Sequence, residues 1–289
     1  MKEMTLDEIH AVNLIVLKEI DRFCREKNIR YGLAYGTLIG AIRHKGFIPW
    51  DDDSDIVMPR EDYDRFVKEY VDSDKFRLYA PEKHNSWLPY GRLCEMKDTF
   101  FGQKSPWTKE KPGIGVDIFP MEDTYDDPQM HAKIINKFCE LRSATLRARY
   151  THVIMPDRDI PSIRKTLIEN FKCLCRIIIR GPKRVIKSLF ADKISNETIY
   201  NFLSAINNHS ITNSSYCSNL RCVVYTDKER IKKDWIQTYK PTEFCGEELM
   251  IPVASHEILT NYYGDYMKLP PESDRRVHTK NQIMYWRDK

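Results

Sequence analysis

Four aspartates stand within five residues, Asp51, Asp52, Asp53 and Asp55, directly before an apolar run at 56–58. Carboxylates this close repel one another, and an uncompensated charge at the edge of a core is costly. A divalent cation would offset both penalties, because hard cations take carboxylate oxygens as ligands. A solvated acidic turn is the alternative, since Asp is common in loops. The apolar run, together with Trp50 before the cluster, favours a cation site.

The composition is that of a globular protein. Of 289 residues, 42% are hydrophobic and 30% are charged, which suits one large domain or a core domain with a helical addition. The formal net charge of +4 is compatible with a phosphate-bearing substrate or an anionic membrane surface. Nucleic acid is not an expected partner, because the cations are dispersed and the sequence has no nucleic-acid-binding motif.

Two further patterns bear on location and redox state. The sequence has no apolar run of about 18 residues or more and no apolar leader segment, so we expect a cytoplasmic protein. Its eight cysteines form no C-x-x-C pair, which argues against a zinc ribbon or a thioredoxin-like site. The cysteines are therefore predicted to be free and mostly buried.

The hydrophobic pattern predicts an α/β (α+β) fold, a mixed sheet core with flanking helices and with its acids at strand ends. A capping box formed by Thr5 and Glu8 begins an amphipathic helix that should lie against the sheet. Gly36 and Thr37 are predicted to form a tight turn. Strands are predicted at 31–35, 53–58, 90–96 and 114–119, and helices at 38–43 and 61–70.

The middle of the chain differs in character. From 128 to about 210 the pattern is helical and basic, and Pro128 suits the first helical turn after an Asp127 cap. Within it, residues 171–190 mix Lys and Arg with Ile, Leu and Phe. This mixture is compatible with peripheral contact at the inner face of the cell membrane, and a buried helix with a solvated basic face would produce the same pattern.

A metal site can be assembled from three of the acids. In a strand, residues two apart point to the same side, so the carboxylates of Asp53 and Asp55 can grip one metal ion. Asp117 stands between Val116 and Ile118, and a carboxylate in such a run needs a cation or a hydrogen-bond donor. Asp117 is therefore a candidate third acid. A salt bridge to a buried arginine is the other interpretation for Asp117.

A candidate phosphate-binding segment precedes the acids. Gly36 and Thr37 stand before a short helix, where backbone N–H groups and the hydroxyl can face a phosphate. Arg43, His44 and Lys45 follow this helix and could neutralise phosphate oxygens. Exposed basic residues on a loop are commonly only solvated, and this alternative stays open for Lys45.

Residues 36–44 (GTLIGAIRH) and 46–55 (GFIPWDDDSD) resemble the LicD family of phosphocholine transferases, which is related to fukutin-type transferases. Families of the nucleotidyltransferase superfamily share a Gly-Ser or Gly-Thr turn, an Asp-x-Asp and a later third acid. Gly36-Thr37, Asp53-x-Asp55 and Asp117 match these in order. Residues 263–272 (YGDYMKLPPE), with the following cations, resemble the family's closing segment. No zinc-binding element of the fukutin kind is evident.

The resemblance implies three regions: a nucleotidyltransferase-like catalytic core at 1–127, a helical basic region at 128–210, and a C-terminal segment at 211–289 that completes the active site. It implies transfer of phosphocholine, or a similar phospho-substituent, from a CDP-linked donor to a glycan hydroxyl on an acceptor that can be lipid-linked, with release of CMP. Mg²⁺ or Mn²⁺ would be the cofactor.

The resemblance also suggests a role for individual residues. Asp53 and Asp55 would be metal ligands, with Asp117 a third ligand or the base. Asp51 and Asp52 would support the loop or reach waters on the metal. Trp50 would stack on a base or cap a choline, or simply pack. Substrate phosphates would be bound by cations of the closing segment, Arg275, Arg276 and His278, unless these form a solvated tail.

Two other functions fit the same residues. A nucleotidyltransferase of this fold would attach NMP from an NTP to a small-molecule, protein or RNA acceptor. A non-catalytic binding protein would keep the fold without turnover. The presence of all three acids argues against the non-catalytic binding protein. The match around Trp50 favours phospho-substituent transfer over nucleotidyl transfer.

Overall fold

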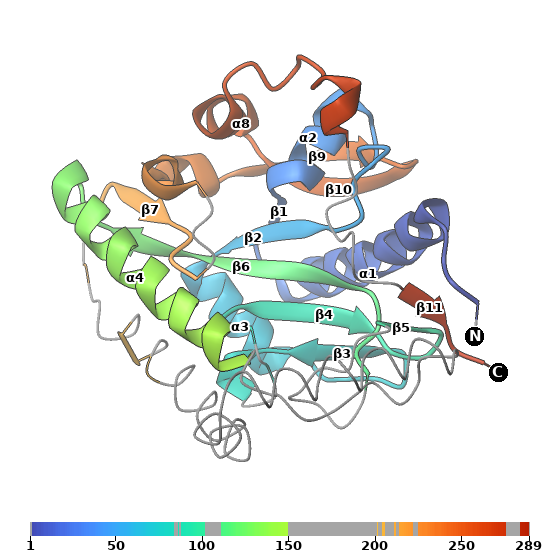
Figure 1. Ribbon diagram of the computed structural model, residues 1–289. Helices are drawn as coiled ribbons and strands as arrows, with labels where there is room; N and C mark the ends of the chain where they lie inside the picture. Colours follow the sequence, from blue (N-terminus) through green and yellow to red (C-terminus); the bar gives the residue numbers. More distant parts are fainter. Residues whose placement is uncertain are drawn as a thin grey trace, which may run out of the picture.

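The computed structural model describes residues 2–83, 86, 88–101, 111–149, 201, 204–205, 211, 214–221, 225–275 and 284–288. A sheet in the order β1-β2-β6-β4-β3 forms its centre (Figure 1). β2 and β6 run parallel, and the other neighbours along this path are antiparallel. The predicted mixed α/β fold is confirmed. The strand bounds are β1 Gly32–Leu33, β2 Asp55–Pro59, β3 Phe76–Tyr79, β4 Gly91–Glu95 and β6 Gly115–Thr124.

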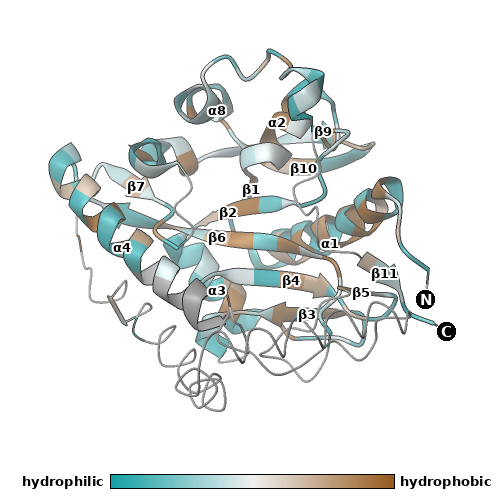
Figure 2. Ribbon diagram, viewed as in Figure 1, coloured by the Kyte–Doolittle hydropathy of each residue, from teal (hydrophilic) through white to brown (hydrophobic). Residues whose placement is uncertain are grey.

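Two helices, α1 (Leu6–Lys27) and α3 (Arg60–Glu69), share one core with one face of the sheet. Phe23 of α1 meets Phe66 of α3 edge to face, with ring centroids 5.4 Å apart. Ile56 and Ile118 of the sheet are buried in this core, whereas Val57 and Phe119 belong to the core on the opposite face. This alternation follows from the two-residue period of a strand. Figure 2 shows the resulting apolar bands along β2 and β6.

The opposite face is covered by segments from both ends of the chain. α2 (Tyr35–Arg43) and α8 (Ser255–Tyr263) lie on this side with two short turns, η2 (Thr226–Glu229) and η3 (Lys233–Ile236). Ala34, Ile258 and Tyr262 pack there with Val57 and Phe119. This face therefore joins residues separated by more than half the chain.

Several local predictions are corrected. The capping box is confirmed, since Thr5 Oγ1 accepts from Glu8 N at 3.3 Å and the Thr5 N–H donates to Glu8 Oε2 at 2.8 Å. The tight turn is wrong, because α2 begins at Tyr35 and takes Gly36 and Thr37 into its first turn. β2 begins at Asp55, so Asp53 lies in the preceding loop, and β6 continues five residues past the predicted end.

Strands of the C-terminal third were not predicted. β9 (Tyr239–Phe244) and β10 (Glu247–Pro252) form a hairpin whose two-residue turn, Cys245-Gly246, has positive φ at both positions. Such a turn matches the twist of the flanking strands. β7 (Tyr216–Ser218) pairs with β6 and with β8 (Ile231–Lys232), and β11 (Met284–Trp286) pairs with β5 (Thr99–Phe101). The remaining short turns are η1 (Pro81–Lys83) and η4 (Glu272–Asp274).

The basic middle region is described at its beginning. α4 spans Pro128–Arg149, and the Asp127 carboxylate accepts from the Gln129 N–H at 2.8 Å, as the predicted cap requires. Residues 171–190, whose pattern is compatible with membrane contact or with a buried helix that has a solvated basic face, lie outside the described residues. Across the part of the chain that is described, no helix combines the length and apolar character needed to cross a bilayer.

Candidate active site

The parallel pairing of β2 and β6 places two of the predicted acids side by side. Asp55 is in register with Asp117, and the Asp117 N–H donates to Ser54 O at 2.9 Å. Side chains two residues apart share a face, so Asp55 and Asp117 lie on the face of Val57 and Phe119. The site therefore opens on the side covered by α2 and α8.

Asp53 is electrostatically linked to the other acids. Burial, together with the Asp53 carboxylate, raises the pKa of Asp51 to about 8, and Asp51 and Asp53 share a hydrogen bond. Burial raises the pKa of Asp55 well above its ordinary value, and Asp53 and then Asp117 add to the shift. Asp53 and Asp55 therefore interact although Asp53 precedes the strand, because the geometry of the loop brings them together.

Asp117 is held by an arginine from the neighbouring strand. Arg92 of β4 pairs opposite it, donating through Nε to Oδ1 and through Nη2 to Oδ2, the latter at 2.9 Å. Burial raises the pKa of Asp117, and the Arg92 guanidinium acts in the opposite direction. This is the ion pair that the sequence left open for Asp117. Arg92 lies within a predicted strand, and its position beside an apolar run was a signal for a buried partner.

Helix α1 anchors the acidic loop through two residues that the sequence analysis missed. The His10 ring lies with Nε2 2.5 Å from Asp51 O and stacks on Phe47 at 4.4 Å. Asn13, fully buried, donates from Nδ2 to Asp52 O at 3.5 Å. Polar residues on the apolar stripe of an amphipathic helix are the signal that could have found them.

Helix α2 supports the same loop from the other side. Thr37 Oγ1 accepts from the Asp55 N–H at 2.9 Å, so this hydroxyl fixes the start of β2. A Cβ atom at Gly36 would lie 2.5 Å from Asp51 Oδ2. Glycine lets the Asp51 carboxylate pack against the start of the helix, and a larger residue at this position would displace that side chain.

A cationic and aromatic group lies beside the acidic loop. The Arg275 guanidinium is 5.2 Å from the centroid of the Trp50 ring. Burial is the main cause that lowers the pKa of Arg43, and the positive charge of Arg275 lowers it further. Arg43 Nε donates to His44 Nε2 at 3.0 Å. Burial, and then Arg43, hold the pKa of His44 below its ordinary value, so its imidazole is neutral near pH 7. Arg43 and Arg275, which are far apart in the chain, therefore lie close together beside Trp50.

The other predicted cations fall differently. The Lys45 side chain is exposed, and its backbone is held at positive φ with its carbonyl accepting from the Cys245 N–H at 2.7 Å. Arg276 and His278 lie outside the described residues. Of the three predicted cations of the closing segment, the structure describes Arg275 and places it beside Trp50, while Arg43 Nη1 donates to the backbone carbonyl of Tyr266 at 2.7 Å.

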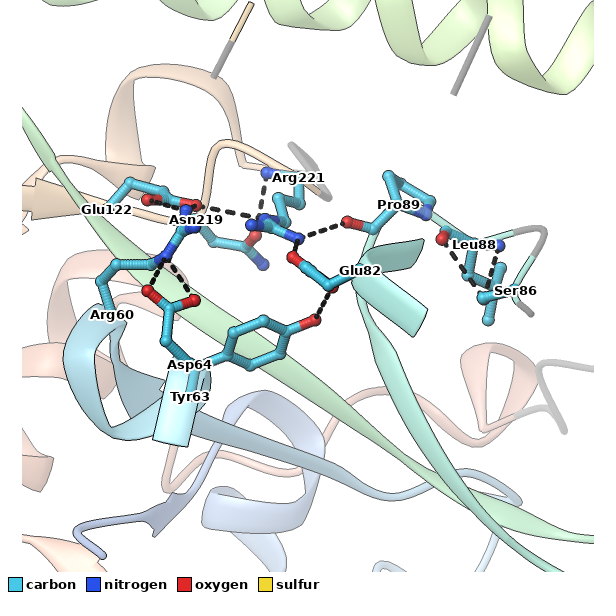
Figure 3. A network of polar contacts seen from close by, with 10 residues as sticks. All are labelled: Arg60, Tyr63, Asp64, Glu82, Ser86, Leu88, Pro89, Glu122, Asn219 and Arg221. Atoms are coloured by element: carbon cyan, nitrogen blue, oxygen red, sulfur yellow. Dashed lines mark hydrogen bonds and ion pairs between the residues drawn. The ribbon is translucent and has the colours of Figure 1, made fainter. Parts of the chain in front are cut away.

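A second charged cluster occupies the far end of the same two strands (Figure 3). Arg221, fully buried, donates through Nη1 to Glu82 at 2.5 Å and through Nε to Glu122 at 3.1 Å. Arg60 donates through Nη1 to both Glu122 oxygens at 2.8 Å and through Nε to Asp64 at 2.9 Å. Each carboxylate in this cluster has an arginine partner. The arrangement ties α3, β6 and the segment after β7 together.

Carboxylate oxygens are the ligands that Mg²⁺ and Mn²⁺ prefer, and Asp53 and Asp55 supply them. In the conformation described, no three Asp, Glu, His or Cys side chains among the placed residues are gathered into a metal-holding set. The Arg92 pair accounts for part of this, because it turns Asp117 to the neighbouring strand. The donor chemistry of Asp53 and Asp55 fits such an ion.

Comparison with known proteins shows which protein family this chain resembles. Residues 28–153 match the family model for the LicD/FKTN/FKRP nucleotidyltransferase domain. The chain is 27% identical over 292 residues to the lipopolysaccharide cholinephosphotransferase LicD of Haemophilus influenzae, covering 96% of this chain and 97% of that protein. An uncharacterized protein of Rickettsia typhi is 40% identical over 63 residues, or 22% of this chain and 20% of that protein. An uncharacterized protein of Rickettsia prowazekii is 45% identical over 47 residues, or 16% of this chain and 18% of that protein.

The matched segment includes the acidic loop, Asp55 and Asp117, so the site lies within a nucleotidyltransferase domain. The chain is therefore similar to LicD along nearly its whole length, and residues 28–153 match the domain model of that family.

Proposed function

We propose that this protein transfers phosphocholine, or a similar phospho-substituent, from a CDP-linked donor to a hydroxyl of a lipopolysaccharide or related cell-surface glycan, releasing CMP. As a LicD homologue it is a phosphotransferase, and phosphocholine transfer to lipopolysaccharide is the activity that its full-length relative's name describes. The observation that carries the proposal is the cluster of Asp51, Asp53, Asp55 and Asp117 at the start of two parallel strands within that family's domain.

Asp53 and Asp55 would hold a Mg²⁺ or Mn²⁺ ion. When bound, such an ion neutralises charge on the donor diphosphate and on the leaving nucleotide. Burial is the main cause of the raised pKa values of Asp51 and Asp55, and the Asp53 carboxylate adds to both; a bound cation would offset these penalties, which supports the assignment. His10, Asn13 and Thr37 fix the loop, which keeps the ligands in place.

Arg43 and Arg275 would bind the donor phosphates. After burial, the Arg275 charge further lowers the pKa of Arg43, so the two guanidiniums repel each other; within the described part of the chain, the carboxylate paired with Arg275 is that of Glu272, 4.0 Å away and 91% exposed. An anion bound between them would relieve their mutual repulsion. Trp50, under the Arg275 guanidinium, offers a flat face on which the cytosine base would stack.

Asp117 remains a proposed third ligand or base. Its bidentate bond to Arg92 favours the ionised carboxylate, and its burial favours the neutral one. A base role requires a proton acceptor within reach of the acceptor hydroxyl, and the register of Asp117 with Asp55 supports this role if the donor binds at Asp55. Arg92 would then position the carboxylate.

The first experiment measures CMP release from CDP-choline, CDP-ethanolamine, CDP-ribitol and CDP-glycerol, with and without Mg²⁺ or Mn²⁺, using water as a slow acceptor. Metal-dependent release from one donor, absent in Asp53→Asn, supports the proposal and names the transferred group. Pyrophosphate release from an NTP, with no CMP from any donor, would move the assignment to nucleotidyl transfer. Flotation with anionic liposomes tests the proposed peripheral membrane contact, and a wholly soluble protein would contradict it.

A further inference from the structure

Four tyrosines, Tyr35, Tyr225, Tyr262 and Tyr263, form a compact aromatic group that no part of the proposed chemistry has used. Tyr225 is its centre, with ring centroids 5.3 Å from Tyr262, 5.3 Å from Tyr263 and 5.9 Å from Tyr35. The Tyr225 hydroxyl donates to the Tyr263 hydroxyl at 2.8 Å. Three separate segments supply these rings: the start of α2, the residue before η2, and the end of α8.

This tyrosine cluster borders the acidic site. Tyr35 is joined to Ala34, whose N–H donates to Asp55 O at 3.0 Å, and to Gly36, on which Asp51 packs. The Tyr35 ring meets Phe119 edge to face at 5.8 Å, on the sheet face that carries Asp55 and Asp117. Tyr35, Tyr225 and Tyr263 are only partly buried, so part of each side chain is open to solvent.

A buried carboxylate orders the rings from beneath. Glu229 is fully buried and accepts from the hydroxyls of Tyr35 at 3.3 Å and Tyr262 at 3.4 Å. It also accepts from the Tyr225 N–H at 3.3 Å. Asn219 Nδ2 donates to the Tyr35 hydroxyl at 2.9 Å. The cluster is therefore preorganised, with a buried carboxyl group behind its aromatic faces.

We propose that the tyrosine cluster binds the quaternary ammonium group of the donor, which makes it the specificity-determining subsite of the proposed transferase; this inference rests on the proposed function. A trimethylated ammonium has no N–H to donate, and it binds best against aromatic faces in a negative field. A primary ammonium needs several acceptors for its N–H groups, and a polyol needs paired donors and acceptors. The faces of tyrosine rings offer neither of these sets of hydrogen-bonding groups, so they suit choline better than ethanolamine or a polyol.

The test pairs two substitutions at one position. Tyr225→Phe keeps the aromatic face and removes the hydroxyl, whereas Tyr225→Leu removes the face. Binding of tetramethylammonium is measured by NMR or calorimetry against ammonium as the control cation, and CMP release is compared between CDP-choline and CDP-ethanolamine. Thermal unfolding of each variant establishes that it is folded.

We expect Tyr225→Leu to weaken tetramethylammonium binding about tenfold and Tyr225→Phe to change it by less than about threefold. The same Leu variant should lose about tenfold in kcat/KM for the choline donor and less for the ethanolamine donor. Glu229→Gln, which keeps the shape and replaces one accepting oxygen with an NH₂ group, should disorder the rings and weaken tetramethylammonium binding in the same direction as Tyr225→Leu.

Failure of this inference is distinguishable from failure of the proposed function. Turnover by the parent protein, with Tyr225→Leu and Tyr225→Phe equally affected or with no preference for tetramethylammonium over ammonium, would overturn the inference alone. Absence of CMP release from every donor by the parent protein would overturn the proposed function, and tetramethylammonium binding would then decide the subsite. Should Tyr225→Leu prove unfolded, Glu229→Gln with the same cation pair decides it.

Discussion

Both ends of the β2–β6 pair carry many charged side chains, but positive and negative charges are balanced at one end and unbalanced at the other. At the far end, Glu82, Glu122 and Asp64 each meet Arg60 or Arg221, and the cluster is closed on itself (Figure 3). At the start of the strands, four aspartates lie near one another and Arg92 pairs with one of them. Charge balance therefore distinguishes the network at the far end from the proposed active site.

The difference also shows in what each cluster does to the fold. Arg221, a buried arginine bonded to two carboxylates, links elements from distant parts of the chain, and removing one partner of such a pair is costly. Packed carboxylates store electrostatic repulsion, which a bound cation or a lost charge would relieve. Stability and function are therefore expected to respond in opposite directions when charges at the two ends are removed.

The largest expected effect is on turnover. Asp55→Asn should reduce CMP release about 1,000-fold or more, because it removes a proposed metal ligand, while the melting temperature without metal stays the same or rises. Asp64→Asn, at the far end and half exposed, is the matched control and should leave turnover unchanged. Near-normal turnover by Asp55→Asn would refute the metal assignment.

Breaking the far cluster should affect stability in the opposite way. Arg221→Met leaves Glu82 and Glu122 without this partner and should lower the free energy of unfolding by about 3–5 kcal/mol, measured by denaturant unfolding. Arg22→Met removes an exposed arginine paired on the surface of α1 and should cost less than about 1 kcal/mol. Equal effects of the two substitutions would mean that the buried network contributes no more than a surface pair.

The third prediction concerns pH. The pKa of Asp51 is about 8 in the folded protein, above the ordinary value of 3.8, so the folded state binds this proton more tightly than the unfolded chain. Its contribution to stability is complete below about pH 4 and is lost as pH rises through about 8. Melting temperature measured with EDTA should therefore fall more steeply across this window than that of Asp51→Asn. Parallel curves for the two proteins would exclude Asp51 as the source.

The smallest expected effect concerns the paired arginines. Arg275→Gln should raise KM for the CDP-linked donor about fivefold, with a smaller change in kcat, because it removes one of two guanidiniums proposed to bind phosphate. The effect should shrink at high ionic strength. Lys268→Gln, which removes an exposed cation nearby in sequence, is the control, and an equal KM change in both would argue against a specific role for Arg275.

Much of the local structure could be predicted from sequence patterns. The capping box at Thr5 and the apolar stripe of the first helix identify α1, and the Asp127-Pro128 pair identifies the start of α4. The turn at Gly36 and Thr37 was mispredicted because glycine usually ends regular structure. Here the close approach of Asp51 requires glycine inside a helix, and a contact between loop and helix is invisible to local propensity.

Sequence by itself determined that four aspartates precede a buried strand, that a fifth lies in a later one, and that the segment around them resembles a known family. These features are local, because they depend on neighbouring residues and strand periodicity. Only the tertiary structure decided that Arg92 pairs with Asp117, that Arg275 reaches Trp50, and that four tyrosines from three segments meet beside Asp55. Such contacts join residues that are distant in the chain, and sheet pairing and packing bring them together.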